Sequence, residues 1–201
     1  MSENERESQR DSQREKLLYG IERPSDLRKL PREAVEQVAQ EIREEILARV
    51  SQTGGHLASS LGAVELITAI HYVFDTPQDR FVLDVGHQGY PHKMLTGRRE
   101  DFASIGKRGG MSKFLRRTES EYDHFGAGHA GTSISAALGM ARAKYHLGEP
   151  GVVIAFERNA RTNKRLRGSG IEVIEVPGSE LDRIGTGTRG LCCPIAREAV
   201  M

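Results

Sequence analysis

The sequence predicts an α/β fold in which amphipathic helices alternate with short apolar strands. Residues 80–85 and 151–156 are short, nearly continuous apolar runs, as expected of strands buried on both faces of a parallel sheet. Glycine-rich loops follow the first run and precede residue 133, where ligands of open α/β sheets often bind. Residues 31–53 repeat apolar side chains at spacings of three and four, which gives a helix one buried stripe (Val35, Val38, Ile42, Ile46 and Val50).

The composition is that of an ordinary soluble α/β protein. Among 201 residues, 29 basic and 28 acidic side chains leave a formal charge of +1, so no basic field points to nucleic acid or a membrane as partner. No apolar run reaches the length of a membrane span, and the N-terminus shows no hydrophobic signal region. The cysteines Cys192 and Cys193 are adjacent, a poor geometry for a structural disulfide. The expected compartment is therefore the cytoplasm.

The first half of the chain reads as a tail followed by helices. Residues 1–16 contain no apolar residue after Met1, so they predict a disordered polar tail. Residues 17–19 are apolar and are expected to dock on the body. Pro31 suits the first turn of the long helix, and the glycines at 54 and 55 end it. Residues 59–74 predict a second helix, capped by Ser59 or Ser60 and broken by the proline at 77.

The second half alternates loops with short elements. Residues 97–125 are polar and glycine-rich, which predicts a short helix and a long loop. A small-residue helix is expected to run to about residue 146. Beyond the second strand, residues 161–167 predict a short basic helix. Residues 171–176 alternate apolar and acidic side chains, which predicts a half-exposed strand.

The loop before the small-residue helix has the local chemistry of an anion site. It reads GAGHAG over residues 126–131, and Thr132 or Ser133 can cap the helix that follows. Glycines allow the backbone to approach a ligand, and the first N–H groups of a helix point at it unpaired. A diphosphate is the ligand that such a loop favours. The alternative, a tight turn in front of a packed helix, remains open.

Four histidines lie beside glycine or proline near predicted element ends, which is a setting of functional sites; ordinary loop or core histidines are the alternative. Their wide separation gives no zinc-type ligand spacing, and no G-x-S-x-G motif supports a serine hydrolase. Asp84 either orients a histidine or starts a turn. The basic pairs at 107–108 and 116–117 are solvated charge or anion ligands. The four histidines are His56, His87, His92 and His129.

Several long strings resemble the N-terminal part of 1-deoxy-D-xylulose-5-phosphate synthase, a transketolase-like enzyme that uses thiamine diphosphate. They are DLRKL (26–30), SQTGGHLASSLG (51–62), HYVFDTP (71–77), DVGHQGYPHK (84–93), LTGRR (95–99), ESEYD (119–123) and the GH loop at 128. The resemblance implies a partial parallel-sheet thiamine-diphosphate-binding domain with flanking helices over residues 17–147. Members of the family condense pyruvate with glyceraldehyde 3-phosphate and release carbon dioxide, at the entry to non-mevalonate isoprenoid biosynthesis. They are dimers, so a homodimer is expected.

The resemblance also implies roles for single residues. His56 resembles the histidine that takes part in proton transfer beside the cofactor, and His87 resembles a histidine that contacts it. Gly128, His129 and Ala130 resemble the cofactor-binding loop. In the family this loop usually reads GHSSTS, whereas here it reads GHAGTS. A hydroxyl is therefore lost at Ala130, while the backbone donors are retained.

The family pattern is lost after residue 146. It should continue through a strand into Gly-Asp-Gly, whose aspartate holds the Mg²⁺ that bridges the diphosphate, because Mg²⁺ takes oxygen ligands beside phosphates. This chain reads VVIAFERN over residues 152–159 instead, so no metal ligand is assigned. The pyrimidine-binding and C-terminal domains of the family are also expected to be missing.

Residues 151–201 resemble the C-terminal end of arginine deiminase and predict a short β-α-β tail. The matching strings are ERNARTN (157–163), GIEVI (170–174), GSEL (178–181) and CPIAR (193–197). The nucleophilic cysteine of that family aligns with Gly190 and its substrate-binding arginine with Gly185. Cys192 lies two positions away, and a nucleophile depends on its geometry. Deiminase activity is therefore not expected.

Three hypotheses follow for this chimeric or truncated chain, with a join near residues 147–151. The first is a synthase module that binds magnesium and thiamine diphosphate, by descent a transferase, here inactive alone. The second is an arginine deiminase-like hydrolase. The third is a non-catalytic remnant or interaction fragment, because neither resemblance supplies a complete site.

Overall fold

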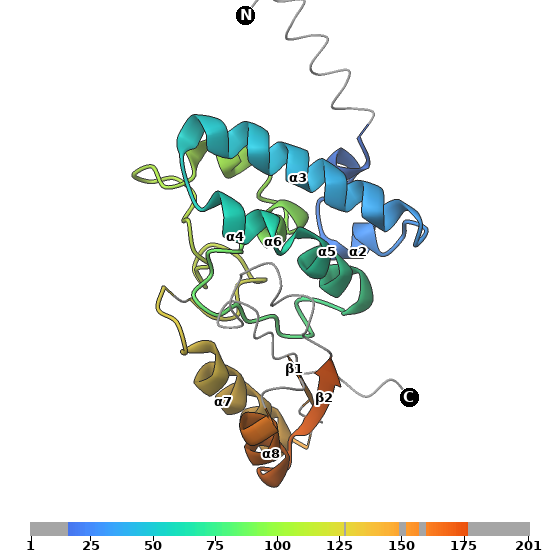
Figure 1. Ribbon diagram of the computed structural model, residues 1–201, viewed down its shortest axis with the longest axis vertical. Helices are drawn as coiled ribbons and strands as arrows, with labels where there is room; N and C mark the ends of the chain where they lie inside the picture. The colour runs from blue at the N-terminus through green and yellow to red at the C-terminus, as the bar shows by residue number, and fades with distance from the viewer. Residues whose placement is uncertain (1–15, 127, 149–151, 157–159, 177–201) are drawn as a thin grey trace, which may run out of the picture.

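The structure is a computed structural model that describes residues 16–126, 128–148, 152–156 and 160–176 (Figure 1). Helix α3 lies across one end of the molecule above α4, α5 and α6, while α7, α8 and the two strands gather at the other end. The elements are, in order, η1 (Leu17–Gly20), α2 (Pro24–Leu27), α3 (Ala34–Thr53), α4 (Leu57–Leu61), α5 (Val64–Val73), α6 (Tyr90–Leu95), η2 (Glu100–Ser104), α7 (Ser133–His146), β1 (Val152–Phe156), α8 (Ala160–Gly168) and β2 (Glu172–Val176).

The predicted long helix is confirmed as α3. Its stripe is buried at Val38, Ile42, Ile46 and Val50, and half-buried at Val35. These side chains form the largest apolar cluster of the described residues, together with side chains of η1, α6 and η2. The helix ends at a glycine, as predicted, in a backbone conformation with φ of 69° that glycine adopts without strain.

The segment at 17–19 docks on α3, as expected, but polar contacts contribute as well as apolar ones. Leu18 is fully buried, and its N–H donates to the buried Glu41 carboxylate at 2.8 Å. The Tyr19 hydroxyl lies 3.2 Å from a carboxylate oxygen of Glu45. Of the predicted tail, residues 1–15 lie outside the described residues, and Lys16 forms an ion pair with Glu44.

The predicted single helix at 59–74 is two helices, α4 and α5, with an interruption at Gly62. The prediction that Ser59 or Ser60 caps a helix is wrong, because both lie inside α4. Their hydroxyls donate instead to the carbonyl oxygen of His87, at 3.3 and 2.8 Å. The serines thus turn toward a loop that is distant in sequence.

The predicted strand at 80–85 is wrong, although the burial that suggested it is real. Phe81, Val82 and Leu83 are at most 2% exposed. The segment forms no helix and pairs with no strand in the part of the chain that the structure describes. The Phe81 N–H donates to the His124 ring at 3.1 Å, and the chain turns away directly after Asp84. The parallel sheet expected within residues 17–147 is therefore not seen there, and helices and loops build that part.

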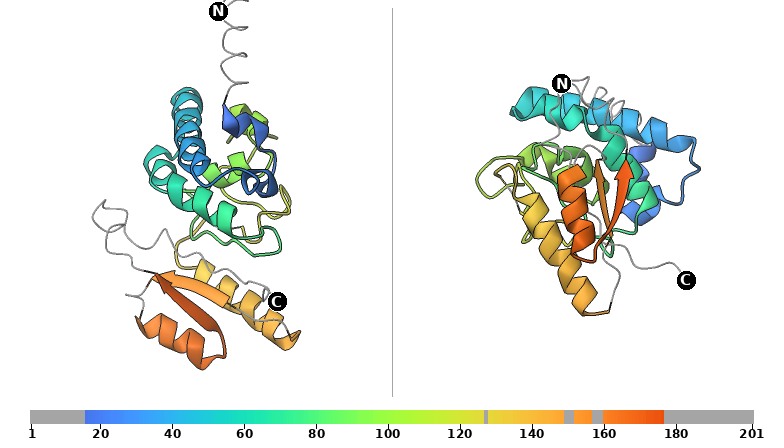
Figure 2. Two further views of the ribbon diagram at one scale, coloured as in Figure 1. Left: turned by 90° about the vertical axis from the view of Figure 1, so that its right-hand side faces the viewer. Right: turned by 60° about the horizontal axis from the view of Figure 1, so that its bottom comes forward.

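The strand–helix–strand tail is confirmed. Strands β1 and β2 pair in parallel, in a register that joins Val152 to Glu172 and Phe156 to Val176, and α8 forms the crossover. Figure 2 shows α7 and α8 beside this two-stranded sheet. A small separate cluster joins them: Ala141 of α7 packs with Leu166, Ile171 and Val173.

The loop region also follows the prediction in part. Residues 97–125 contain the short 3-10 helix η2 and are otherwise irregular. Helix α6 was not predicted; it begins at Tyr90, with Pro91 in its first turn, where the missing N–H costs nothing.

Among the described residues, no helix combines the length and the apolar character needed to cross a bilayer. Residues 185–193, including Gly190, Cys192 and Cys193, lie outside the described part.

Candidate functional site

His56 and His87 are brought together although they are 31 positions apart in the sequence. Their ring centroids lie 4.0 Å apart with the planes tilted by 33°. Phe114 borders both rings, with centroid distances of 6.1 Å to His56 and 5.2 Å to His87. His56 immediately precedes α4, and its N–H lies 3.4 Å from the hydroxyl of Tyr90. The fold therefore supplies an imidazole pair against an aromatic wall.

The environment of His87 favours its neutral imidazole. Burial lowers the pKa of His87, and the neighbouring His56 lowers it further, because two adjacent cations repel each other. His56 is exposed and His87 is half-buried. At neutral pH the neutral His87 ring can accept a proton or a hydrogen bond.

The loop residues Gly128, His129 and Ala130 are exposed. No hydrogen bond of their backbone N–H groups to a protein acceptor is seen in the described part of the chain. The loop turns at Gly131, whose φ of 83° suits glycine, and α7 begins two residues later. Exposed, unpaired N–H groups in front of a 14-residue helix are available to an anion.

The His87 loop and the Gly128 loop flank the same segment. A Cβ on Gly86 would lie 3.5 Å from Phe114, and one on Gly126 would lie 3.3 Å from the Leu115 carbonyl oxygen. Asp84 connects the loops directly. Its carboxylate accepts hydrogen bonds from the N–H of Gly131, at 2.9 Å to each oxygen, and of Ser133 at 3.2 Å. The carboxylate of Asp84 therefore holds the start of α7. Its carbonyl oxygen accepts from the Gly86 N–H at 2.6 Å, so Asp84 also starts a turn, as one alternative proposed.

His92 does not join this site. It is fully buried in a chain of hydrogen bonds that sequence reasoning missed. One set of neutral tautomers satisfies the whole chain: Thr76 donates to His71 Nδ1 at 2.9 Å, His71 Nε2–H donates to His92 Nδ1 at 2.9 Å, and His92 Nε2–H donates to Asp123 at 3.0 Å. Arg98 completes it with two bonds to the Asp123 carboxylate, both 2.8 Å.

A second acidic residue anchors the same loop. Glu119 accepts from the buried ammonium of Lys93, from Arg98 at 3.0 Å and from the N–H of Ser112 at 2.8 Å. These contacts hold residues 112–123 against α6. The separations of 21 and 31 residues along the His71–His92–Asp123 chain carry no periodic signal, so no sequence pattern could have found it.

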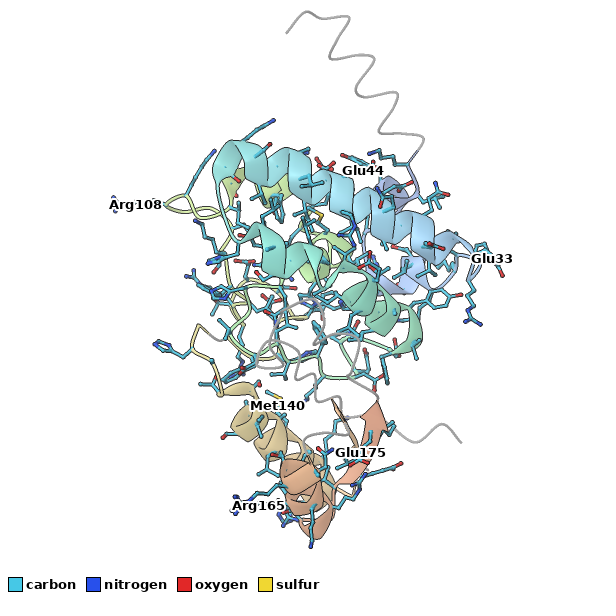
Figure 3. The ribbon with its side chains drawn as sticks, viewed as in Figure 1. Glu33, Glu44, Arg108, Met140, Arg165 and Glu175 are labelled. Atoms are coloured by element: carbon cyan, nitrogen blue, oxygen red, sulfur yellow. The ribbon has the colours of Figure 1, made fainter. Side chains whose placement is uncertain are left out.

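The basic pairs at residues 107–108 and 116–117 lie at the surface, where solvated charges are expected. Arg108 projects from the tip of its loop, away from the body (Figure 3). Arg117 lines an open cavity of 770 Å³ together with Arg80, His124 and Met140. None of the five residues to which the sequence assigns a cofactor role lines this cavity. In the described part, no group of three or more histidine, cysteine or acidic side chains has a metal-binding arrangement.

Comparisons with known proteins agree with both resemblances. The family model described as 1-deoxy-D-xylulose-5-phosphate synthase matches residues 18–159, and that of arginine deiminase matches residues 148–197. Among curated proteins, the synthase of Methylibium petroleiphilum is 61% identical over 133 residues, which cover 66% of this chain and 21% of the relative. The synthase of Cupriavidus necator is 59% identical over 139 residues, 69% of this chain and 22% of the relative.

The chain thus spans about a fifth of the length of the curated relatives that it matches. The synthase match nevertheless extends over more than two thirds of the chain, from η1 through the His56, His87 and Gly128 loops to the end of β1. On this evidence, the chain belongs to the 1-deoxy-D-xylulose-5-phosphate synthase family.

Proposed function

We propose that the chain forms the diphosphate-binding half of a thiamine diphosphate site. The Gly128–Ala130 backbone is proposed to bind the diphosphate, His87 to contact the cofactor, and His56 to serve in proton transfer. The observation that carries the proposal is the contact between the rings of His56 and His87, whose centroids lie 4.0 Å apart. The Asp84 carboxylate joins the His87 loop to Gly131, which directly follows the exposed residues 128–130. Imidazoles and unpaired amides fit an anionic cofactor that also needs proton management.

The residues present fit the diphosphate better than they fit its metal. A Cβ added at Gly128 or at Gly131 would meet no heavy atom within 4 Å, so space exists beside the loop. When bound, thiamine diphosphate supplies an electron sink for decarboxylation and transfer of a two-carbon unit. The segment in which the family carries its magnesium aspartate reads Phe156-Glu157-Arg158 here. We therefore propose weak binding with little dependence on Mg²⁺, because the aspartate that holds the metal in the family is replaced here.

The neutral state of His87 is relevant to its proposed role. A lowered pKa keeps the ring able to accept a hydrogen bond or a proton at neutral pH. His56 lies in ring contact with it, with centroids 4.0 Å apart, so the two proposed roles fall on neighbouring side chains. The Phe114 ring lies against His87, with centroids 5.2 Å apart.

The wider setting is proposed from the family. The whole protein of this family would act as a transferase on pyruvate and glyceraldehyde 3-phosphate in isoprenoid biosynthesis, in the cytoplasm and as a homodimer. We propose that the chain is inactive alone, because the aspartate that holds Mg²⁺ beside the diphosphate in the family is not present at residues 156–158. Deiminase activity is not proposed, because Gly190 at the nucleophile position has no nucleophilic side chain.

Isothermal titration calorimetry of the full chain with thiamine diphosphate tests the proposal. Saturable binding at millimolar cofactor is expected, changing little when Mg²⁺ is replaced by a chelator. Thiamine without its diphosphate is expected not to bind. His87→Ala should weaken binding, whereas Arg108→Ala, which removes a charge at the distant loop tip, should not. No heat of binding at millimolar thiamine diphosphate from a folded chain would reject the proposal.

A further inference from the structure

We propose that Asp84 is a positioning residue of the candidate cofactor site. Its carboxylate holds the Gly128–Thr132 loop in the binding conformation without touching the cofactor. The expected effect on cofactor affinity rests on the proposed function. The positioning role itself rests on geometry alone. The basis is the geometry of one buried side chain that joins two loops 47 positions apart.

Both oxygens of the Asp84 carboxylate accept hydrogen bonds from the N-terminal end of α7 and the loop before it. Both of its oxygens accept from the Gly131 N–H at 2.9 Å, and one also accepts from the Ser133 N–H at 3.2 Å. Asp84 is 3% exposed and Ser133 is fully buried, so water does not replace these bonds easily. An anion at the N-terminus of a helix is also favoured by the helix dipole. The two N–H groups are therefore satisfied by protein, and the exposed ones before them are left for a ligand.

The other side of Asp84 is equally constrained. Its carbonyl oxygen accepts from the Gly86 N–H at 2.6 Å, which closes a three-residue turn around Val85. Val85 has φ of 60°, a conformation that is strained for a β-branched residue and persists only where the surroundings enforce it. The Gln88 side chain donates to the same carbonyl at 3.0 Å. The turn delivers His87 to Ser60, which donates to its carbonyl at 2.8 Å.

Asp84 thus fixes both parts of the site relative to each other. Without its carboxylate, a loop rich in glycine loses its anchor at Gly131 and becomes conformationally heterogeneous. Glycine loses more conformational freedom on ordering than any other residue. Part of the binding free energy would then be consumed in ordering the loop. A weakening of cofactor binding of about tenfold or more is expected, since ordering a single residue already has a cost of that size.

Asp84→Asn and Asp79→Asn make a matched pair for the test. Asp79 lies five positions upstream, is also buried, and its carboxylate also accepts a backbone N–H, that of Asp75, at 2.7 Å. Both variants keep the size of the side chain and remove one buried charge. Calorimetry with thiamine diphosphate, at a temperature where each variant is fully folded, is expected to show about tenfold weaker binding for Asp84→Asn. Asp79→Asn is expected to stay within about twofold of the parent.

Amide hydrogen exchange, followed by NMR without cofactor, provides the second measurement. The Gly131 and Ser133 amides should exchange faster in Asp84→Asn, and should keep the parent rates in Asp79→Asn. Equal affinity of Asp84→Asn and the parent, or equal loss in both variants, would overturn the proposal. If the parent itself does not bind thiamine diphosphate, the proposed function fails. The exchange result then decides the positioning role alone, and unchanged rates at both amides overturn it.

Discussion

Acidification should destabilise this protein through the buried histidine chain, and the size of the effect can be worked out. His92 is fully buried between His71 and Asp123, and desolvation lowers its pKa from 6.5 to about 4 despite the opposing effect of Asp123. Burial and the adjacent His92 also hold the pKa of His71 well below its ordinary range. The folded protein therefore resists protonation of groups that the unfolded chain protonates readily.

Thermodynamic linkage gives the direction of this effect on stability and the pH range over which it occurs. Because the folded pKa of His92 is the lower one, its contribution to stability is complete above pH 6.5. The contribution is lost as the pH falls from 6.5 toward 4, where the unfolded chain binds a proton that the folded chain does not. The difference between the unfolded and folded pKa of His92 corresponds to about 3 kcal/mol of folding stability, of which about 2 kcal/mol is lost by pH 5. The pKa of Asp123 is lowered, so its own effect appears only below 3.8 and does not enter this window.

Urea unfolding at pH 7.5 and pH 5 measures this loss as a change in the free energy of unfolding. In His92→Gln the difference between the two pH values should shrink by about 2 kcal/mol, since the titrating group is gone. His129→Gln, at an exposed position, should keep the parent difference. Equal stability of the parent at both pH values would refute the reasoning, as would an undiminished pH difference in His92→Gln.

Two further predictions concern folding alone. A Cβ on Gly110 would lie 2.2 Å from the backbone oxygen of Ser104, so Gly110→Ala should lower the free energy of unfolding in a urea titration by about 1–3 kcal/mol. A Cβ on Gly20 would meet no atom within 4 Å, so the control Gly20→Ala should stay close to the parent in the same titration. Arg99 donates to two backbone oxygens of residues 18–21 and stacks at 4.6 Å on a tyrosine ring. Arg99→Lys should therefore lower the thermal midpoint by several degrees, and an unchanged midpoint would contradict this role for the guanidinium.

The periodicity of apolar side chains correctly predicted the helix α3 and the strand β2. The stripe from Val38 to Val50 specified α3, and Gly54 specified its end. The alternation in residues 171–176 specified β2. The tail formed as predicted because its crossover is short and its parallel partner lies only 20 residues away. Such elements combine periodicity with a nearby partner.

Burial without a partner misled the prediction at residues 80–85. Apolar runs such as Phe81–Leu83 indicate that a segment is buried, but pairing depends on another strand, which a single run cannot specify. Ser60 was misassigned for a similar reason. A serine near a helix start resembles a cap, and its actual acceptor, the His87 carbonyl, lies 27 residues away. Long-range hydrogen bonds leave no periodic trace in sequence.

The candidate site shows the same division. Residue chemistry indicated the loop at 126–131, and the family resemblance added His56 and His87; their roles stay predictions. The contact between their rings depends on tertiary packing around Phe114. The strings at 84–93 and 119–123 identified the family, yet His92, Lys93, Glu119 and Asp123 in them build a structural network. A recognisable string therefore marks an ancestral core as readily as a reactive centre.

The small cluster of α7, α8 and β2 has a consequence for local stability. It contains few buried apolar side chains, far fewer than the cluster around α3, so this unit should open at a lower free energy than global unfolding. Helix α7 belongs to both regions: Ala141 packs on the deiminase-like unit, while Ser133 is held by Asp84. Partial opening of this unit would therefore loosen the helix that supports the glycine loop.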